Sequence, residues 1–240
     1  MKKVLALVLA LVLVLSLAAC GGENRNSVEK PSMTKEELLE EAQDTSIRKM
    51  GEDFSNNVSK AKDTYFNKAF KVWGVIFEIG EDYVDIRPSD KFIEDPMYVY
   101  LPNEELKELT KGNVIQVVGI ITDDIEVSKQ VHDQTGALQT RTLKVFTMEN
   151  AHFVTDKYEI KNSIITDISY DRSSMKYTCE VSDENFDKIY VKSGQVSNEQ
   201  WGNYQKYKLS ASGKIKLEEV YNSEVCAVME SSDVELTNKN

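Results

Sequence analysis

Few residues of this chain have the type and spacing that catalysis or metal binding requires. The two histidines, His132 and His152, are 20 positions apart, and neither has Cys or His beside it at the spacing of a zinc site. An acidic cluster consists of Asp123, Asp124, Glu126 and Asp133. It lacks the ordered spacing of a calcium loop, so we expect a solvated loop there. With neither a phosphate-binding glycine loop nor a Gly-x-Ser-x-Gly elbow, the sequence predicts no enzyme, no cofactor and no metal.

Residues suited to binding a ligand are easier to find. The candidates are Trp73, Tyr83, Arg87, Tyr98 and Tyr100. Tyrosine rings that remain exposed can stack on sugars or bases or dock a peptide. The alternative is that strand alternation turns half of these tyrosines into the core, and that the preceding helix covers Trp73.

The three cysteines have different expected roles. Cys179 and Cys226 would share a compartment that permits a disulfide if the chain is exported, and we consider a bridge between them. The alternative is two thiols packed as small apolar residues, because the sequence cannot show that the sulfurs meet. Cys20 follows an apolar run and belongs to a different pattern.

The N-terminus has the three-part layout of a secretory signal peptide. Lys2 and Lys3 precede an apolar run from Val4 to Leu17, which is shorter than the roughly 20 residues that span a bilayer. The segment Leu17-Ala18-Ala19-Cys20 resembles the lipobox of bacterial lipoproteins, in which the cysteine is lipidated. The resemblance implies a signal peptide over 1–19, a lipidated Cys20 with a flexible tether over 20–33, and a mature chain on the extracytoplasmic face of the cell membrane. Two acyl chains suffice as an anchor.

The segment after the tether predicts one helical region and then strands. Thr34 and Glu37 have capping-box spacing, so we expect a helix over 34–50 that resumes toward Tyr65, within a helical segment 34–62. From 63 to 154, β-branched and aromatic residues alternate as in strands. The order is three strands, a short helix from Asn103, and two strands, which is the order of the five-stranded OB barrel.

Two glycine-containing patterns strengthen the OB prediction. Gly74 and Gly119 lie mid-strand, where glycine is tolerated at a sharp bend, and Val72, Ile76, Ile115, Val117 and Ile121 should then point inward. The residues Tyr65, Lys68, Phe70, Val72, Gly74 and Ile76, followed by Gly112-Asn113-Val114-Ile115-Gln116-Val117-Val118-Gly119, resemble the tRNA-anti-like OB domains of bacterial lipoproteins. These domains usually have glycine at the position that Asn67 occupies here, so the sequence departs from the pattern at this residue. The resemblance implies an OB-fold barrel over 63–154.

The remaining segment, 155–240, also predicts strands, with a short helix before a long glycine-containing strand. Met229-Glu230-Ser231 echoes Met148-Glu149-Asn150. We interpret this segment as a second β-rich domain, with OB-like topology as one reading and an unrelated β lobe as the other. A lysine stripe, comprising Lys206, Lys208, Lys214 and Lys216, should form a solvated face, or dock an anionic partner.

The formal charge of −11 bears on the partners. Nucleic-acid binding draws much of its affinity from basic side chains, and no segment of the chain is basic, so we expect nucleic acid to be an improbable partner. The leading hypothesis is a membrane-anchored, non-catalytic OB-fold module that binds an unknown protein or glycan ligand of the envelope. The alternatives are an envelope-acting hydrolase with a carboxylate site and a structural assembly factor.

Overall fold

The structure is a computed structural model that describes residues 33–88, 96–132, 138–172, 175–193, 200, 202–220 and 224–239. The expected signal peptide 1–19, Cys20 and nearly all of the tether 20–33 lie outside these residues. Within the described part of the chain, no helix is long and apolar enough to cross a membrane. The described residues belong to one unit, Met33–Asn240.

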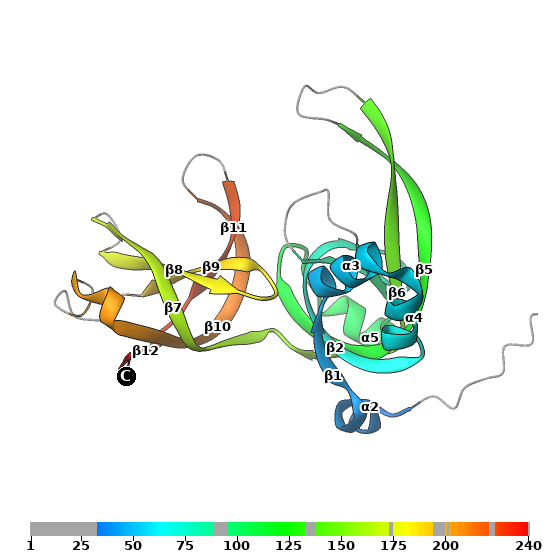
Figure 1. The fold of residues 1–240 in the computed structure, drawn as a ribbon, viewed down its shortest axis with the longest axis horizontal. Coiled ribbons are helices and arrows are strands. Elements are labelled where there is room, and N and C mark those ends of the chain that lie inside the picture. The colour runs from blue at the N-terminus through cyan, green and yellow to red at the C-terminus, as the bar shows by residue number, and fades with distance from the viewer. Residues whose placement is uncertain are drawn as a thin grey trace, which may run out of the picture. The chain divides into compact units, whose positions relative to one another are not determined.

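The first β unit is a closed five-stranded barrel (Figure 1). Its elements are β2 (Lys68–Ile79), β3 (Val84–Arg87), β4 (Met97–Val99), α5 (Asn103–Lys107), β5 (Val114–His132) and β6 (Leu138–Thr155). Strand β2 pairs antiparallel with β3 and β5, β3 pairs with β4, β4 pairs parallel with β6, and β6 returns antiparallel to β5. This connectivity, with a helix between the third and fourth strands, is that of an OB fold, so the fold class is confirmed.

The barrel interior is apolar, as the alternation predicts. Val72, Ile76, Ile115, Val117 and Ile121 are all at most 2 % exposed and belong to one core cluster. Strand β2 pairs with β5 up to Val75 and with β3 from Val75 onward, so it turns from one neighbour to the other beside Gly74. A Cβ built on Gly74 would lie 2.8 Å from the Cβ of Ile86. The glycine is therefore needed for close packing at this bend.

The helical segment before the barrel is divided by a strand. Its elements are α2 (Lys35–Glu41), β1 (Gln43–Ser46), α3 (Ile47–Asn56) and α4 (Val58–Tyr65). The capping box is present, because Glu37 N donates to Thr34 Oγ1 and Thr34 N donates to Glu37 Oε2. The predicted unbroken helix over 34–50 is wrong: β1 pairs parallel with Phe70–Trp73 of β2 and satisfies backbone groups on that edge.

Helix α3 covers the barrel with its apolar face, formed by Ile47, Met50 and Phe54. Helix α4 adds Tyr65, whose hydroxyl donates to Asp53 Oδ2 at 2.5 Å. Burial, together with this carboxylate, raises the pKa of Tyr65 to about 12. The hydrogen bond fixes the angle between the two short helices.

The second β unit has the same strand connectivity as the first. Its elements are β7 (Lys157–Asp171), β8 (Lys176–Asp183), β9 (Asp187–Ser193), η1 (Tyr204–Lys206), β10 (Tyr207–Val220), β11 (Glu224–Glu230) and β12 (Asp233–Asn238). Strand β7 pairs antiparallel with β8 and β10, β8 with β9, β9 parallel with β11, and β11 antiparallel with β10. The pairings give the OB order again, and β12 adds a strand along the first half of β10.

The sequence echo between the two units has a structural basis. Gly119 on β5 and Gly213 on β10 occupy the fourth strand of each barrel, and each faces a methionine of the fifth strand. A Cβ on Gly119 would lie 2.7 Å from Met148 Cγ, and one on Gly213 would lie 3.1 Å from Met229 Cγ. The repeated Met-Glu motif therefore marks one packing arrangement used in both barrels.

Of the two alternatives for Cys179 and Cys226, the disulfide is not formed. Cys179 lies on β8 and Cys226 on β11, and β9 pairs with both strands. Two strand spacings put roughly 10 Å between these backbones, whereas a disulfide needs Cα atoms within about 7 Å. Cys179 is instead fully buried in the second core, where burial raises the pKa of its thiol and makes it a poor nucleophile.

Candidate tyrosine face and the pocket beneath α5

Three of the predicted binding residues meet on the outer side of β3 and β4. Val84 and Ile86 point into the core, so the alternate positions of β3 and β4 face outward, and Asp85 pairs in register with Tyr98. The ring of Tyr83 lies 4.8 Å from that of Tyr98 and 6.1 Å from that of Tyr100, centroid to centroid. We call Tyr83, Tyr98 and Tyr100 the tyrosine face.

Local packing holds Tyr83 in this position. A Cβ on Gly80 would lie 2.4 Å from Tyr83 Cε1, so the turn needs glycine for the ring to lie against it. Burial, followed by the charge of Glu78, raises the pKa of Tyr83, so its hydroxyl stays protonated at neutral pH. Tyr100 is the most open of the three, with 36 % of its surface exposed. The face thus offers ring surface and neutral hydroxyl groups.

Arg87 lies on the same strand but is buried rather than presented to solvent. Its Nε and NH2 groups donate to Asp85 at 3.2 and 2.9 Å, and the guanidinium carbon lies 3.5 Å from the centre of the Phe77 ring. Arg87 is 3 % exposed and Asp85 is fully buried. This pair stabilises β3, which follows Tyr83 and pairs with β4, the strand that carries Tyr98.

Trp73 does not belong to the tyrosine face, and the preceding helix does not account for its packing. Its ring lies 4.7 Å from that of Tyr158 at a steep angle, and it packs against the core of the second β unit. The Tyr158 hydroxyl donates to Asp183 and accepts from Asn185 Nδ2 at 2.8 Å. Trp73 is therefore part of the packing that joins β2 to the second core.

The acidic cluster is not a solvated loop. Asp124 lies within β5, its side chain is 10 % exposed, and its carboxylate contacts Lys62 at 2.8 Å and Lys144 at 3.4 Å. These contacts join α4 to the base of the β5–β6 hairpin. The side chains of Glu126, His132 and Asp133 lie outside what the structure describes. Among the described residues, no group of three potential ligands could hold a metal ion.

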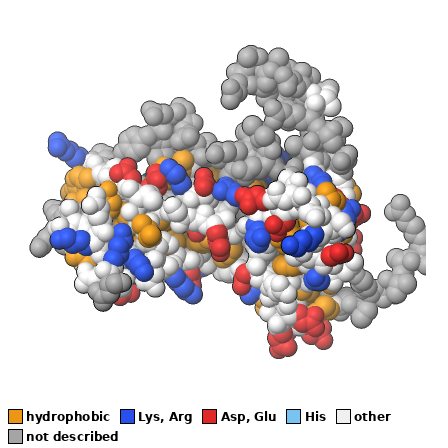
Figure 2. Space-filling view, viewed as in Figure 1, with side chains coloured by type: hydrophobic (Ala, Val, Ile, Leu, Met, Phe, Trp, Pro, Cys, Tyr) orange, Lys and Arg blue, Asp and Glu red, His pale blue; other side chains and the backbone are white. Residues whose placement is uncertain are grey.

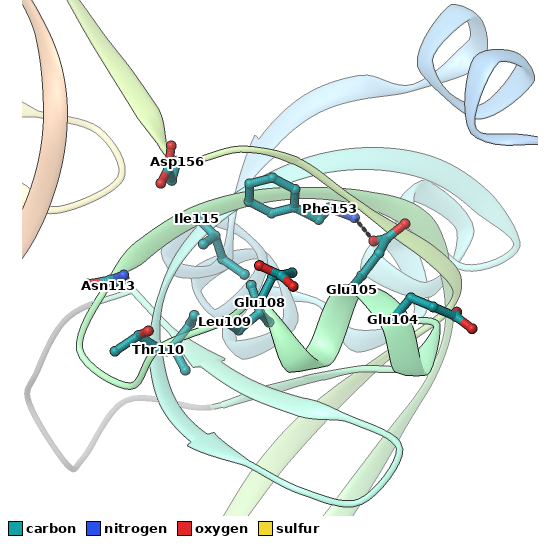
Figure 3. Close-up of a pocket in the computed structure, with 10 residues that line it drawn as sticks. Glu104, Glu105, Glu108, Leu109, Thr110, Asn113, Ile115, Phe153 and Asp156 are labelled. Atoms are coloured by element: carbon teal, nitrogen blue, oxygen red, sulfur yellow. Dashed lines mark hydrogen bonds between the residues drawn. The ribbon is translucent and has the colours of Figure 1, made fainter.

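A second feature, which the sequence analysis missed, is an open pocket beneath α5 (Figure 3). It has a volume of about 300 Å³. It is lined by Ile76, Glu104, Glu105, Glu108, Leu109, Thr110, Asn113, Ile115, Phe153 and Asp156. Glu105 is held in place because its carboxylate accepts from the Phe153 N–H at 2.5 Å and lies 3.0 Å from His152 Nδ1. The sequence feature that could have indicated this pocket is the spacing of three glutamates, Glu104, Glu105 and Glu108, on the short helix α5 and at its end.

Charge is distributed unevenly over the surface. Figure 2 shows acidic side chains gathered over α2 and basic side chains over the part of the second unit that contains η1 and β10. On β10, Leu209, Ala211 and Ile215 are buried, and the lysine stripe lies on the opposite, outer face. One member, Lys214, is paired with Asp156 at 2.5 Å.

The strand order and the helix between the third and fourth strands define an OB-fold domain. The chain belongs to the tRNA_anti-like family, whose model matches residues 1–131. The match begins earlier than the resemblance at 63–154 suggested, and ends within β5.

Two solved structures are similar in part. One is a lipoprotein from Klebsiella pneumoniae to which nucleic-acid binding is ascribed, with 21 % identity, a TM-score of 0.35, and coverage of 51 % of this chain and 99 % of that one. The other is a deletion mutant of the single-stranded DNA binding protein from Thermus aquaticus, with 10 % identity, a TM-score of 0.28, and coverage of 72 % and 94 %. No curated protein matches. The family match does not test the expectation that nucleic acid is an improbable partner.

Proposed function

We propose that this chain is a lipid-anchored, extracytoplasmic binding protein without catalytic activity, and that it holds a protein or glycan of the cell envelope on its tyrosine face. The observation that carries this proposal is the grouping of Tyr83, Tyr98 and Tyr100 on the outer side of β3 and β4, the second and third strands of the OB barrel. This is the face that OB folds use for oligonucleotides and oligosaccharides. Neighbouring aromatic rings with hydroxyl groups suit sugar rings and peptide groups alike.

Nucleic acid is the competing ligand class, since it would use the same rings. Base stacking on aromatic side chains needs a basic groove to hold the phosphates. Next to the tyrosines, the charge of Arg87 is compensated by Asp85, and Glu78 adds negative charge. The formal charge of −11 acts in the same direction at longer range. These charges favour an uncharged or cationic ligand over a polyphosphate.

Replacing Tyr98 and Tyr100 by alanine should weaken ligand capture by about tenfold or more, since stacking is worth roughly 1–3 kcal/mol per ring. The assay presents the full chain, in detergent, to protein and glycan fractions of isolated envelopes and to labelled single-stranded oligonucleotides at low salt. Tyr170→Ala is the matched control, because Tyr170 is 46 % exposed and its ring lies against another tyrosine, Tyr177, 4.6 Å away. If only the oligonucleotides bind, and their binding depends on the tyrosines, the ligand of this face is nucleic acid and the proposal of an envelope protein or glycan is wrong.

The anchor is tested separately. Cys20→Ala should yield a chain that carries no lipid and is either released from the membrane or left uncleaved, because the thiol is the expected acceptor of the acyl-bearing group. Mass spectrometry of the membrane and soluble fractions measures this directly. A wild-type chain that retains Met1–Ala19 and has no acyl mass would contradict the lipoprotein proposal.

A further inference from the structure

The pocket beneath α5 combines an apolar floor with a charged edge. Ile76, Leu109, Ile115 and Phe153 supply apolar surface from β2, the α5–β5 connection, β5 and β6. The wall is fixed by backbone hydrogen bonds, since Ile76 N donates to Asn113 O and Gly112 N donates to Ile76 O. The pocket is therefore a preformed feature of the barrel end (Figure 3).

Its four carboxylates differ in how they are partnered. Glu105 is engaged by His152 and the Phe153 N–H, and Asp156 by Lys214. Glu104 and Glu108 are exposed, lie one helical turn apart on α5 and its end, and pair with no cation among the described residues. Both Glu108 and Asp156 line the cavity (Figure 3). The pocket thus carries uncompensated negative charge beside an apolar floor.

We propose that this pocket receives a lysine or arginine side chain of a partner protein, with its aliphatic stem on Leu109 and Phe153 and its cationic head at Glu104 and Glu108. A long basic side chain has this combination of an apolar stem and a charged tip. Charge-assisted hydrogen bonds to carboxylates are the stronger kind. A cavity of about 300 Å³ is at the lower end of the range for ligand sites, which suits one side chain.

This inference goes beyond the proposed function, because none of the three tyrosines lines the pocket. An anionic or phosphate-bearing ligand would meet repulsion from the glutamates. A neutral apolar ligand would leave the two carboxylates without a partner. The basic side chain is the occupant that satisfies both halves of the pocket.

The test uses the full chain, in detergent, with isoleucine methyl groups isotopically labelled, and follows the Ile76 and Ile115 signals by NMR. The probe is an acetylated Gly-Lys-Gly amide, with norleucine in place of lysine as the neutral comparison and an arginine version as a second cation. The lysine and arginine peptides should shift both signals, whereas Ile189, buried in the second core, should not respond. The norleucine peptide should bind about tenfold more weakly or not at all, which corresponds to the loss of one charged contact.

The variant E104Q/E108Q should weaken the lysine peptide by about tenfold and leave the norleucine peptide unchanged. Its matched control is E36Q/E40Q on α2, which removes the same charge from exposed helix positions of the same spacing. Replacing Tyr98 and Tyr100 by alanine should leave the peptide affinity unchanged, so this result is independent of the tyrosine face. Equal binding of the norleucine peptide, or an affinity insensitive to E104Q/E108Q, would overturn the proposal.

Discussion

Replacing Gly119 by valine should lower the free energy of unfolding by about 3 kcal/mol, at the upper end of the roughly 1–3 kcal/mol that overpacking costs. The added Cβ would lie 2.7 Å from Met148 Cγ, 2.8 Å from Ala151 Cβ and 2.9 Å from Ala151 Cα. The last of these atoms is backbone, so relief requires β6 to move away from β5. Thermal unfolding of a unit of this size should shift down by about 6–12 °C, as measured by circular dichroism.

Two other glycines, at which an added side chain would be less crowded, should give smaller losses of stability and so test the order of the effects. A Cβ on Gly213 would meet Glu230 O at 3.0 Å and the flexible Met229 side chain, so Gly213→Val should cost less than Gly119→Val. A Cβ on Gly202 meets nothing within 4 Å, and Gly202→Val serves as the control. Should Gly119→Val not fold, Gly119→Ala tests the same contact with one carbon. Melting midpoints that do not follow the order Gly119, Gly213, Gly202 would contradict the barrel packing described above.

Breaking the buried ion pair of Asp85 and Arg87 should lower the free energy of unfolding by a comparably large amount. Arg87→Ala removes both hydrogen bonds to a carboxylate that is fully buried, and we expect a loss of about 3–5 kcal/mol of stability, measured by urea unfolding. Lysine at this position should not restore the loss, because it cannot donate to both oxygens in one plane.

Two variants separate the pair from a general effect of lost charge. Asp85→Leu combined with Arg87→Met removes both charges, and it should be less destabilised than Arg87→Ala, because no buried carboxylate loses its partner. Lys49→Ala breaks a pair with Asp53 that is largely exposed, and should change stability by less than about 1 kcal/mol. If Arg87→Ala behaves like Lys49→Ala, the pair does not support the face as we describe it.

The barrel was predictable because its signals are local. Glycines at Gly74 and Gly119 interrupt strands whose inward residues alternate strictly, and the short helix that starts at Asn103 separates the third strand from the fourth. The capping box at Thr34 is likewise a contact between residues three apart. Such features are visible in sequence because both partners lie within one element.

The failures have one cause, which is that the deciding partner is distant in sequence. Gln43–Ser46 is too polar and short to indicate a strand, and it becomes one because β2 offers a free edge. Trp73 packs on Tyr158, and no pattern near Trp73 indicates this contact. The choice between a disulfide and two packed thiols was left open for the same reason, since only the strand order shows that β9 separates the two cysteines.

The candidate site was predictable in part. Strand alternation was enough to bring Tyr83, Tyr98 and Tyr100 together. It did not show that Arg87 would be buried, because the partner Asp85 sits on the same strand face and draws the guanidinium inward. The pocket escaped prediction since its walls come from four separate elements that meet only at the closed end of the barrel.

The parallel pairing of the third and fifth strands has a consequence for the kinetics of folding. Met97 pairs with Phe146 and Ile189 with Ala227, so each barrel closes through residues roughly 40–50 positions apart, and chains dominated by such long-range pairs fold in milliseconds to seconds. Until closure, the edges of β4 and β9 are open to pairing with another chain. A chain with two such barrels passes through this aggregation-sensitive interval twice. At high expression, the yield of folded protein should therefore depend more strongly on temperature and concentration than the stability of the native state would indicate.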